Sequence, residues 1–257
     1  MLIDQQLLGA VERIVRDAGE VVRRIYETDF QVASKSDDSP VTLADQQAEA
    51  VILRGLAALT PDIPVVAEEA VAAGQLPRLA GPGAPFWLVD PLDGTKEFIQ
   101  RNGEFTVNVA LVEGGEPVLG VVLTPALARL HAGGRGLGAL VEDSSGRRAI
   151  HCRRPPPEGL TVVASRSHGD EAALSAWLGS RKVAQRVNAG SSLKLCLVAE
   201  GRADLYPRLG RTMEWDIAAG HAVLAAAGGH VTRIDDGQPL RYGKPGFENP
   251  HFVAAGL

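Results

Sequence analysis

The sequence predicts an α+β protein with two unlike halves, an antiparallel-sheet half followed by an α/β half. Three observations predict this class. Apolar residues recur at helical spacing near the N-terminus, alternating runs joined by glycine-containing turns follow, and strands then alternate with helices in the second half. The 257 residues, 45% of them hydrophobic and 22% charged, are enough to bury a sizeable core.

Two amphipathic helices are expected first. Apolar residues from Ile3 to Ile25 recur every three or four positions, so one face of the first helix packs inward. The second helix follows Pro40 and is terminated by Pro61, because proline cannot continue a helix interior. Asp45 falls in its first turn, where a carboxylate suits the helix dipole.

Short apolar runs then predict the strands of the first sheet. These strands are expected at residues 64–67, 86–89, 105–112, 117–123, 129–132 and 138–141. Residues 113–116 and 133–136 supply the turn residues of two hairpins, so we expect antiparallel pairing. The strand at 86–89 is expected to end at Asp90, because Pro91 cannot continue a central strand.

A proline-rich stretch at residues 153–159 is the expected linker between the halves, which are residues 1–152 and 160–257. The second half alternates strands and helices, as in an α/β arrangement. Strands are expected at 160–164, around 183, and at 203–206, 231–234 and 251–254, with helices at 170–178, 191–199 and 215–227.

The segment Asp90-Pro91-Leu92-Asp93-Gly94-Thr95 places two carboxylates at the mouth of a strand-to-helix turn. The free amides of Gly94 and Thr95 can hold an anion there. Crowded carboxylates repel unless cations lie between them, and Mg²⁺ prefers oxygen ligands together with waters and a phosphate. The turn therefore favours Mg²⁺ plus a phosphoryl group, although a purely structural turn explains this string equally well in isolation.

Composition excludes several classes of function. The net charge is −5 with no basic stripe, which argues against a nucleic-acid polymer as partner, and no apolar stretch is long enough to span a bilayer. Acidic residues at Asp4, Glu12 and Asp17 argue against a signal peptide. Cys152 and Cys196 lack motif spacing, so two thiols in a reducing cytosol are expected.

Three separated motifs resemble the inositol monophosphatase superfamily of Mg²⁺-dependent, lithium-sensitive phosphatases. They are Ala67-Glu68-Glu69, residues 87–95 and residues 214–220. A narrower resemblance, to the bacterial 3′(2′),5′-bisphosphate nucleotidases, is carried by residues 90–99, 101–108, 165–168, 190–194 and 206–208. The resemblance implies the layered α-β-α-β-α sugar-phosphatase fold, with metals mostly on the first half and substrate specificity mostly on the second.

The implied activity is hydrolysis of adenosine 3′,5′-bisphosphate (PAP) to AMP and phosphate by metal-activated water, in sulfate assimilation. Inositol-1-monophosphatase, fructose-1,6-bisphosphatase and a non-catalytic nucleotide- or metal-binding regulator stay as alternatives. The expected partner is a small nucleotide bisphosphate. A monomer and a homodimer both remain open, and the expected location is cytoplasmic, with peripheral contact at the inner membrane left open.

The resemblance also implies roles for individual residues. Glu68, Asp90 and the Leu92 carbonyl would hold one Mg²⁺, while Asp90, Asp93 and Asp216 would hold a second, with a third ion left open. Asp45, Glu68 and Thr95 would be catalytic. The implied substrate-binding residues are Glu68, Leu92, Asp93, Gly94, Thr95, Ser165, Arg166, His168, Gly190, Ser191, Lys194, Glu214 and Asp216.

Overall fold

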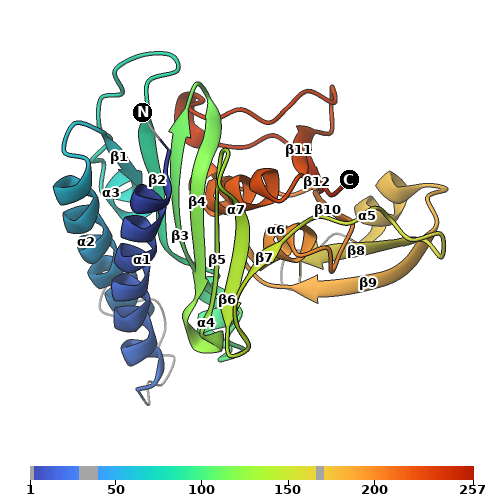
Figure 1. The fold of residues 1–257 in the computed structure, drawn as a ribbon, viewed down its shortest axis with the longest axis horizontal. Helices are drawn as coiled ribbons and strands as arrows, with labels where there is room; N and C mark the ends of the chain where they lie inside the picture. The colour runs from blue at the N-terminus through green and yellow to red at the C-terminus, as the bar shows by residue number, and fades with distance from the viewer. Residues whose placement is uncertain (1–2, 29–39, 166–170) are drawn as a thin grey trace.

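The computed structural model describes residues 3–28, 40–165 and 171–257. Its elements form five layers in the order α-β-α-β-α, which confirms the predicted fold class (Figure 1). The helices are α1 (Gln5–Tyr26), α2 (Pro40–Leu59), α3 (Glu68–Ala72), α4 (Thr95–Ile99), α5 (Glu171–Leu178), α6 (Leu193–Ala199) and α7 (Glu214–Ala226), with 3₁₀ turns η1 (Pro125–Leu127) and η2 (Pro245–Phe247). No helix among these described residues is both long and apolar enough to cross a membrane.

The first sheet has seven strands in the order of the sequence. They are β1 (Val65–Ala67), β2 (Phe86–Asp93), β3 (Thr106–Glu113), β4 (Glu116–Thr124), β5 (Arg129–Gly134), β6 (Gly138–Asp143) and β7 (Gly146–Ile150). All neighbours pair antiparallel except β1 and β2, which are parallel because the connection through α3 returns the chain to the starting edge. The edge strand β7 was not expected, since its residues are mostly exposed and show no apolar alternation.

The end of β2, where the predicted metal-binding turn lies, differs from the prediction. β2 does not end at Asp90 but continues to Asp93. Asp90 pairs with Asn108 and Asp93 pairs with Thr106, so the register shifts between them. The irregularity accommodates Pro91, because a bulge tolerates a residue that cannot donate to the ladder.

The second sheet is mixed, with strand order β11-β12-β10-β8-β9. Its strands are β8 (Leu160–Ser165), β9 (Val183–Ala189), β10 (Leu205–Arg208), β11 (His230–Arg233) and β12 (Phe252–Ala255). β8 is parallel to both neighbours, whereas β12 is antiparallel to both of its neighbours. The helix expected from Ser191 begins at Leu193, because Ser191 adopts a left-handed φ of 53° that a helix interior does not accept.

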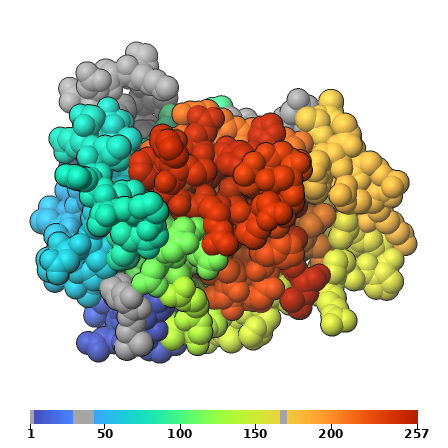
Figure 2. Space-filling view, turned by 90° about the horizontal axis from the view of Figure 1, so that it is seen from above, coloured from blue at the N-terminus to red at the C-terminus, as the bar shows by residue number. Residues whose placement is uncertain are grey.

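Separate hydrophobic clusters fill the spaces between the layers. One packs α1 and α2 on the outer face of the first sheet, a second fills the space around α6 and α7, and a third lies under α5. Helix α7 contacts β3, β4 and β5, and a Cβ added at Gly120 would lie 2.3 Å from the Ala219 carbonyl oxygen. Figure 2 views the molecule from above and shows the C-terminal part of the chain, in red, in the middle, flanked by the cyan and yellow segments.

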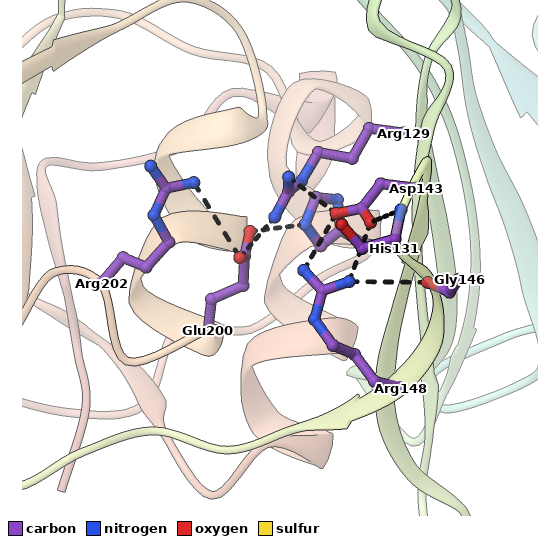
Figure 3. Close-up of polar contacts among 8 residues, drawn as sticks. Arg129, His131, Asp143, Gly146, Arg148, Glu200 and Arg202 are labelled. Atoms are coloured by element: carbon purple, nitrogen blue, oxygen red, sulfur yellow. Dashed lines mark hydrogen bonds and ion pairs between the residues drawn. The ribbon is translucent and has the colours of Figure 1, made fainter.

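A network of charged side chains holds the C-terminal end of α6 against the first sheet (Figure 3). Glu200, at that end, accepts hydrogen bonds from Arg129 at 2.5 Å and bonds to Nε2 of His131 at 2.8 Å. Asp143 joins the network through Arg129 at 3.0 Å and Arg148 at 2.9 Å. Because the side chains of Glu200 and His131 are shielded from water, their contact helps to fix where α6 lies, and α6 carries Lys194 near its other end.

Candidate active site

Two acidic residues lie side by side where the parallel strands β1 and β2 finish their pairing. Ala67 pairs with Val89 in register, so the residues that follow, Glu68 and Asp90, emerge at the same edge of the sheet. Glu68 opens α3, and Asp90 is buried within β2. A short helix and a buried strand therefore each contribute one carboxylate.

The third acid comes from a distant part of the sequence. Asp216 lies in the first turn of α7, where its Oδ2 accepts the Met213 N–H at 2.8 Å. One carboxylate oxygen from each of Glu68, Asp90 and Asp216 lies within 4.8 Å of the other two. Three hard oxygen donors at this spacing fit a divalent cation such as Mg²⁺. The donor set is therefore able to hold a metal ion.

Asp93 and Leu92 follow Asp90 through the bulge. The Leu92 N–H donates to Oδ1 of Asp90 at 3.0 Å, which fixes the orientation of that carboxylate. Oδ2 of Asp93 accepts the Ser191 hydroxyl at 2.7 Å, so this acid is tied to the second half of the chain. Asp90 and Asp93 are only three residues apart in the sequence, but because of the bulge their carboxylates have different hydrogen-bond partners.

Burial raises the pKa of every acid in this cluster, and neighbouring carboxylates add to the effect. The pKa is raised to about 8 for Asp45, about 7 for Glu68 and about 8 for Asp216. The pKa of Asp90 lies well above its ordinary value, mainly through burial and then through repulsion by the other acids. The pKa of Asp93 is also raised by burial, against the opposing effect of the Lys194 charge. At neutral pH these crowded carboxylates are therefore stabilised by binding either protons or cations.

Asp45 reaches the same cluster from α2. Its side chain is buried, and repulsion from Glu69 and Glu68 contributes to its raised pKa. The three implied catalytic residues therefore come from three helices, α2 and the first turns of α3 and α4. Of these, Thr95 is exposed and lines the cavity described next.

A cavity of about 480 Å³ adjoins the acids between the two halves. Of the predicted residues, those that line it are Asp93, Gly94, Thr95, Ser165, Ser191, Lys194 and Asp216. Gly94 has a φ of 96° and precedes α4, and a Cβ there would lie 3.3 Å from the Phe105 backbone, so glycine suits this position. Arg166 and His168 lie outside the described residues.

Cationic side chains line the same cavity as the acids, and two of them, Lys194 and Arg208, come from the second half of the chain near Asp93 and Asp216. Lys194 is buried, its Nζ donates to the Ser191 carbonyl at 2.5 Å, and it lies 5.5 Å from the centre of the Tyr206 ring. Burial lowers the pKa of Lys194 to about 8, while Asp93 opposes that change. Arg208 has a buried Nε with no hydrogen-bond partner among the described residues.

Sequence reasoning had not assigned a role to Arg208 or to several other residues that line the cavity. They are Lys96, Glu97, Ile99, Ser192, Leu195, Tyr206, Arg208, Arg211, Thr212 and Ile217. Arg208 stands in the segment Tyr206-Pro207-Arg208, which carried part of the resemblance. Its position at the end of a β-strand, next to other polar site residues, was the available signal.

Two predicted substrate contacts make other bonds. Glu214 is fully buried, and its carboxylate accepts the N–H groups of Gly243 and Lys244 at 2.7 and 2.9 Å and pairs with the Lys244 ammonium. The Gly190 N–H donates to Glu104 at 2.8 Å. Neither residue lines the cavity among the described residues, so both hold neighbouring loops in place.

Comparison with known proteins agrees with the fold and the acid cluster. The model of the inositol monophosphatase family matches residues 4–255, and the chain belongs to that family. The chain is similar to the 3′(2′),5′-bisphosphate nucleotidase CysQ of Escherichia coli strain K12, with 47% identity over 251 residues that cover 96% of this chain and 98% of the relative. The corresponding protein of Haemophilus influenzae is 31% identical and covers all of this chain and 95% of the relative.

Solved structures of CysQ and of an inositol monophosphatase are also similar to this chain. CysQ from Bacteroides thetaiotaomicron, a bacterial member of the inositol monophosphatase family, superposes with a TM-score of 0.86 at 36% identity, covering 100% of this chain and 99% of that chain. An inositol monophosphatase from Anabaena superposes with a TM-score of 0.76 at 28% identity, covering 98% of this chain and 90% of that chain.

Proposed function

We propose that this protein is a Mg²⁺-dependent 3′(2′),5′-bisphosphate nucleotidase that converts PAP to AMP and phosphate. The observation that carries the proposal is one cavity lined both by the carboxylates of Asp93 and Asp216 and by the cations Lys194 and Arg208. A bisphosphate needs both: acids that hold cations around the phosphate to be cleaved, and cations for the remaining phosphate. The similarity to nucleotidases at 47% identity supports the same substrate class.

Glu68, Asp90 and the Leu92 carbonyl would hold one Mg²⁺, and Asp90, Asp93 and Asp216 would hold a second. When bound, these ions neutralise the crowded carboxylates and offset the charge that develops on the phosphoryl oxygens. The number of ions, two or three, belongs to the proposal. The cluster of three oxygens within 4.8 Å is the observation that supports a metal here.

The chain's own residues then perform the displacement. Thr95, together with Asp45 or Glu68, orients the attacking water, and the carboxylate accepts its proton. As the water oxygen bonds to phosphorus, the bond from phosphorus to the 3′ oxygen breaks, and that oxygen takes up the proton that the carboxylate accepted, relayed by water, and leaves as the ribose hydroxyl. The amides of Gly94 and Thr95 donate to the phosphoryl oxygens. No covalent intermediate with a side chain is required.

Lys194 and Arg208 bind the part of the substrate that does not react. The Lys194 ammonium is fixed by Ser191, and the unpartnered Nε of Arg208 is a donor available to an anion. Such contacts give specificity, because the metal cluster can recognise only the phosphate being cleaved. We infer a cytoplasmic location, since PAP arises as a by-product of sulfate activation and sulfonation.

A substrate panel tests the proposal. Phosphate release is measured with PAP, its phosphosulfate analogue, inositol 1-phosphate and fructose 1,6-bisphosphate, each with Mg²⁺ and with a chelator. PAP should give the highest kcat/KM, and the chelator should abolish release. Faster release from inositol 1-phosphate than from PAP would overturn the nucleotidase assignment, and no release from any substrate would overturn the assignment as an enzyme.

A further inference from the structure

The helix that carries Glu68 begins without a cap of its own. Ala67 occupies the N-cap position of α3 and supplies no side-chain hydrogen bond. The first N–H groups of any helix lack partners within the helix, and they need acceptors from elsewhere. With only five residues, α3 has little intrinsic stability, so the acceptors that meet its first turn decide how Glu68 is held.

Glu49 of α2 supplies these acceptors. Its Oε2 accepts the Glu69 N–H at 2.9 Å, and its carboxylate also accepts the N–H of Ala70. Glu49 lies four residues after Asp45, and its side chain is only 6% exposed. One buried carboxylate therefore joins the helix that carries Asp45 to the first turn of the helix that begins with Glu68.

A carboxylate at this position is electrostatically costly. Glu49 adds repulsion to Asp45 and to Glu68, both of which are already crowded by other acids. The two N–H bonds favour the ionised form of Glu49 and oppose that cost. Among the described residues, Glu49 belongs neither to the group of oxygens within 4.8 Å of one another nor to the lining of the cavity that holds Lys194. Its contacts are therefore to backbone rather than to metal or substrate.

We propose that Glu49 is a positioning residue that caps α3 from the neighbouring helix and thereby orients Glu68 toward Asp90 and Asp216. The proposal rests on the proposed function only in that Glu68 holds a metal ion. Hydrogen bonds made around metal ligands set their orientation, and their loss typically weakens metal affinity about 10- to 100-fold. Glu49 acts through the backbone of the ligand's own helix.

The test measures metal binding without turnover. Mn²⁺, a paramagnetic substitute for Mg²⁺, is titrated into the protein with no substrate present, and free Mn²⁺ is followed by electron paramagnetic resonance. Glu49→Met keeps the length of the side chain but removes the acceptor, and it should weaken Mn²⁺ affinity about 10- to 100-fold. Glu49→Gln keeps a carbonyl acceptor and should restore most of the affinity. Glu49→Ala is the second variant if the methionine variant does not fold.

Glu12→Met is the matched control. Glu12 is another buried helical carboxylate, and it binds Arg147 at 2.7 and 2.8 Å on the far part of the first sheet. The Glu12→Met variant should have a lower melting temperature than the unmodified protein and the same Mn²⁺ affinity. The KM for PAP, measured at saturating Mg²⁺, should not change in Glu49→Met.

Each outcome decides one of the proposals. Unchanged Mn²⁺ affinity in a folded Glu49→Met or Glu49→Ala variant overturns the positioning role, and so does a glutamine variant as weak as the methionine variant. Failure of the unmodified protein to bind Mn²⁺ overturns the metal site itself, and with it both proposals.

Discussion

The Ser191 hydroxyl donates a hydrogen bond of 2.7 Å to Oδ2 of Asp93, which lies 98 positions earlier in the sequence. The same hydroxyl meets the hydroxyl of Thr106, and the Ser191 carbonyl accepts the Lys194 ammonium. Ser191 holds these contacts in a left-handed conformation with φ of 53°, which is unfavourable for serine. One strained residue therefore links a proposed metal ligand to a proposed substrate-binding cation.

Ser191→Ala should lower kcat/KM for PAP, because Asp93 loses a hydrogen bond to its charged form. A bond of this kind contributes roughly 1.5–3 kcal/mol, which corresponds to about 10- to 100-fold. Steady-state phosphate release measures the effect. Ser145→Ala, at an exposed turn, is the control and should behave like the unmodified protein. A loss below twofold in Ser191→Ala would show that the link to Asp93 does not contribute.

Asp216→Asn should nearly abolish turnover and should stabilise the protein when a chelator is present. The pKa of Asp216 is raised by burial to about 8 in the folded state, from an ordinary value of 3.8. Between these two pH values the Asp216 carboxyl is protonated in the folded protein but ionised in the unfolded chain. The contribution of Asp216 to the free energy of unfolding is therefore lost as pH rises from 3.8 to about 8. The asparagine side chain has no such loss.

Thermal unfolding in a chelator at pH 5 and pH 9 checks this prediction. The melting temperature of Asp216→Asn should exceed that of the unmodified protein by more at pH 9 than at pH 5. Asp93→Asn should also lose activity, because the same cluster is disrupted. Near-normal turnover of either variant at saturating Mg²⁺ would contradict the metal assignment.

Lys194→Ala should affect PAP more than a monophosphate. The charge-assisted bond from Lys194 contributes roughly 1.5–3 kcal/mol, so its loss should lower kcat/KM for PAP about 10- to 100-fold. Inositol 1-phosphate has no second phosphate and should be affected much less. The ratio of the two losses is the measurement. Equal losses would indicate that Lys194 acts on the shared phosphate or on Ser191, whose carbonyl it binds.

Li⁺ should inhibit phosphate release. The acids that would hold Mg²⁺ are hard oxygen donors, and a small monovalent cation that occupies one of these positions supplies less charge. Rates are compared in LiCl and in matched NaCl at fixed Mg²⁺. Raising the Mg²⁺ concentration shows whether the two ions compete. Equal rates in the two salts would contradict this expectation.

The layer order and most elements were predictable because their signals are local. Helical spacing from Ile3 to Ile25 reflects which face of α1 is buried, and the β-prone residues at 105–112 marked a strand, although β3 proves to be buried on both faces. The extension of β2 through Pro91 was not predictable, because a bulge depends on the partner strand. The exposed strand β7 likewise has no pattern of its own and forms only because β6 offers a free edge.

The acids were predictable from motifs, whereas their supporting contacts were not. Glu68 and Asp216 stand in the first turns of α3 and α7, and Asp90 lies within β2, just before the bulge at Pro91. Glu214 belongs to the same motif as Asp216, yet its carboxylate binds the loop at Gly243. Which of two neighbouring acids faces the cavity depends on how α7 is rotated between the sheets, and that rotation is a property of the packed core rather than of the motif.

Helix α7 lies against the inner face of the seven-stranded sheet, but it follows every strand of that sheet in the sequence. During synthesis, every strand of the sheet is therefore made before the helix that covers it. Until α7 is made, the apolar side chains around Gly120 lack the helix that covers them in the folded protein. The same helix brings Asp216, so the nascent chain can complete the group of three acids only in the last part of its translation.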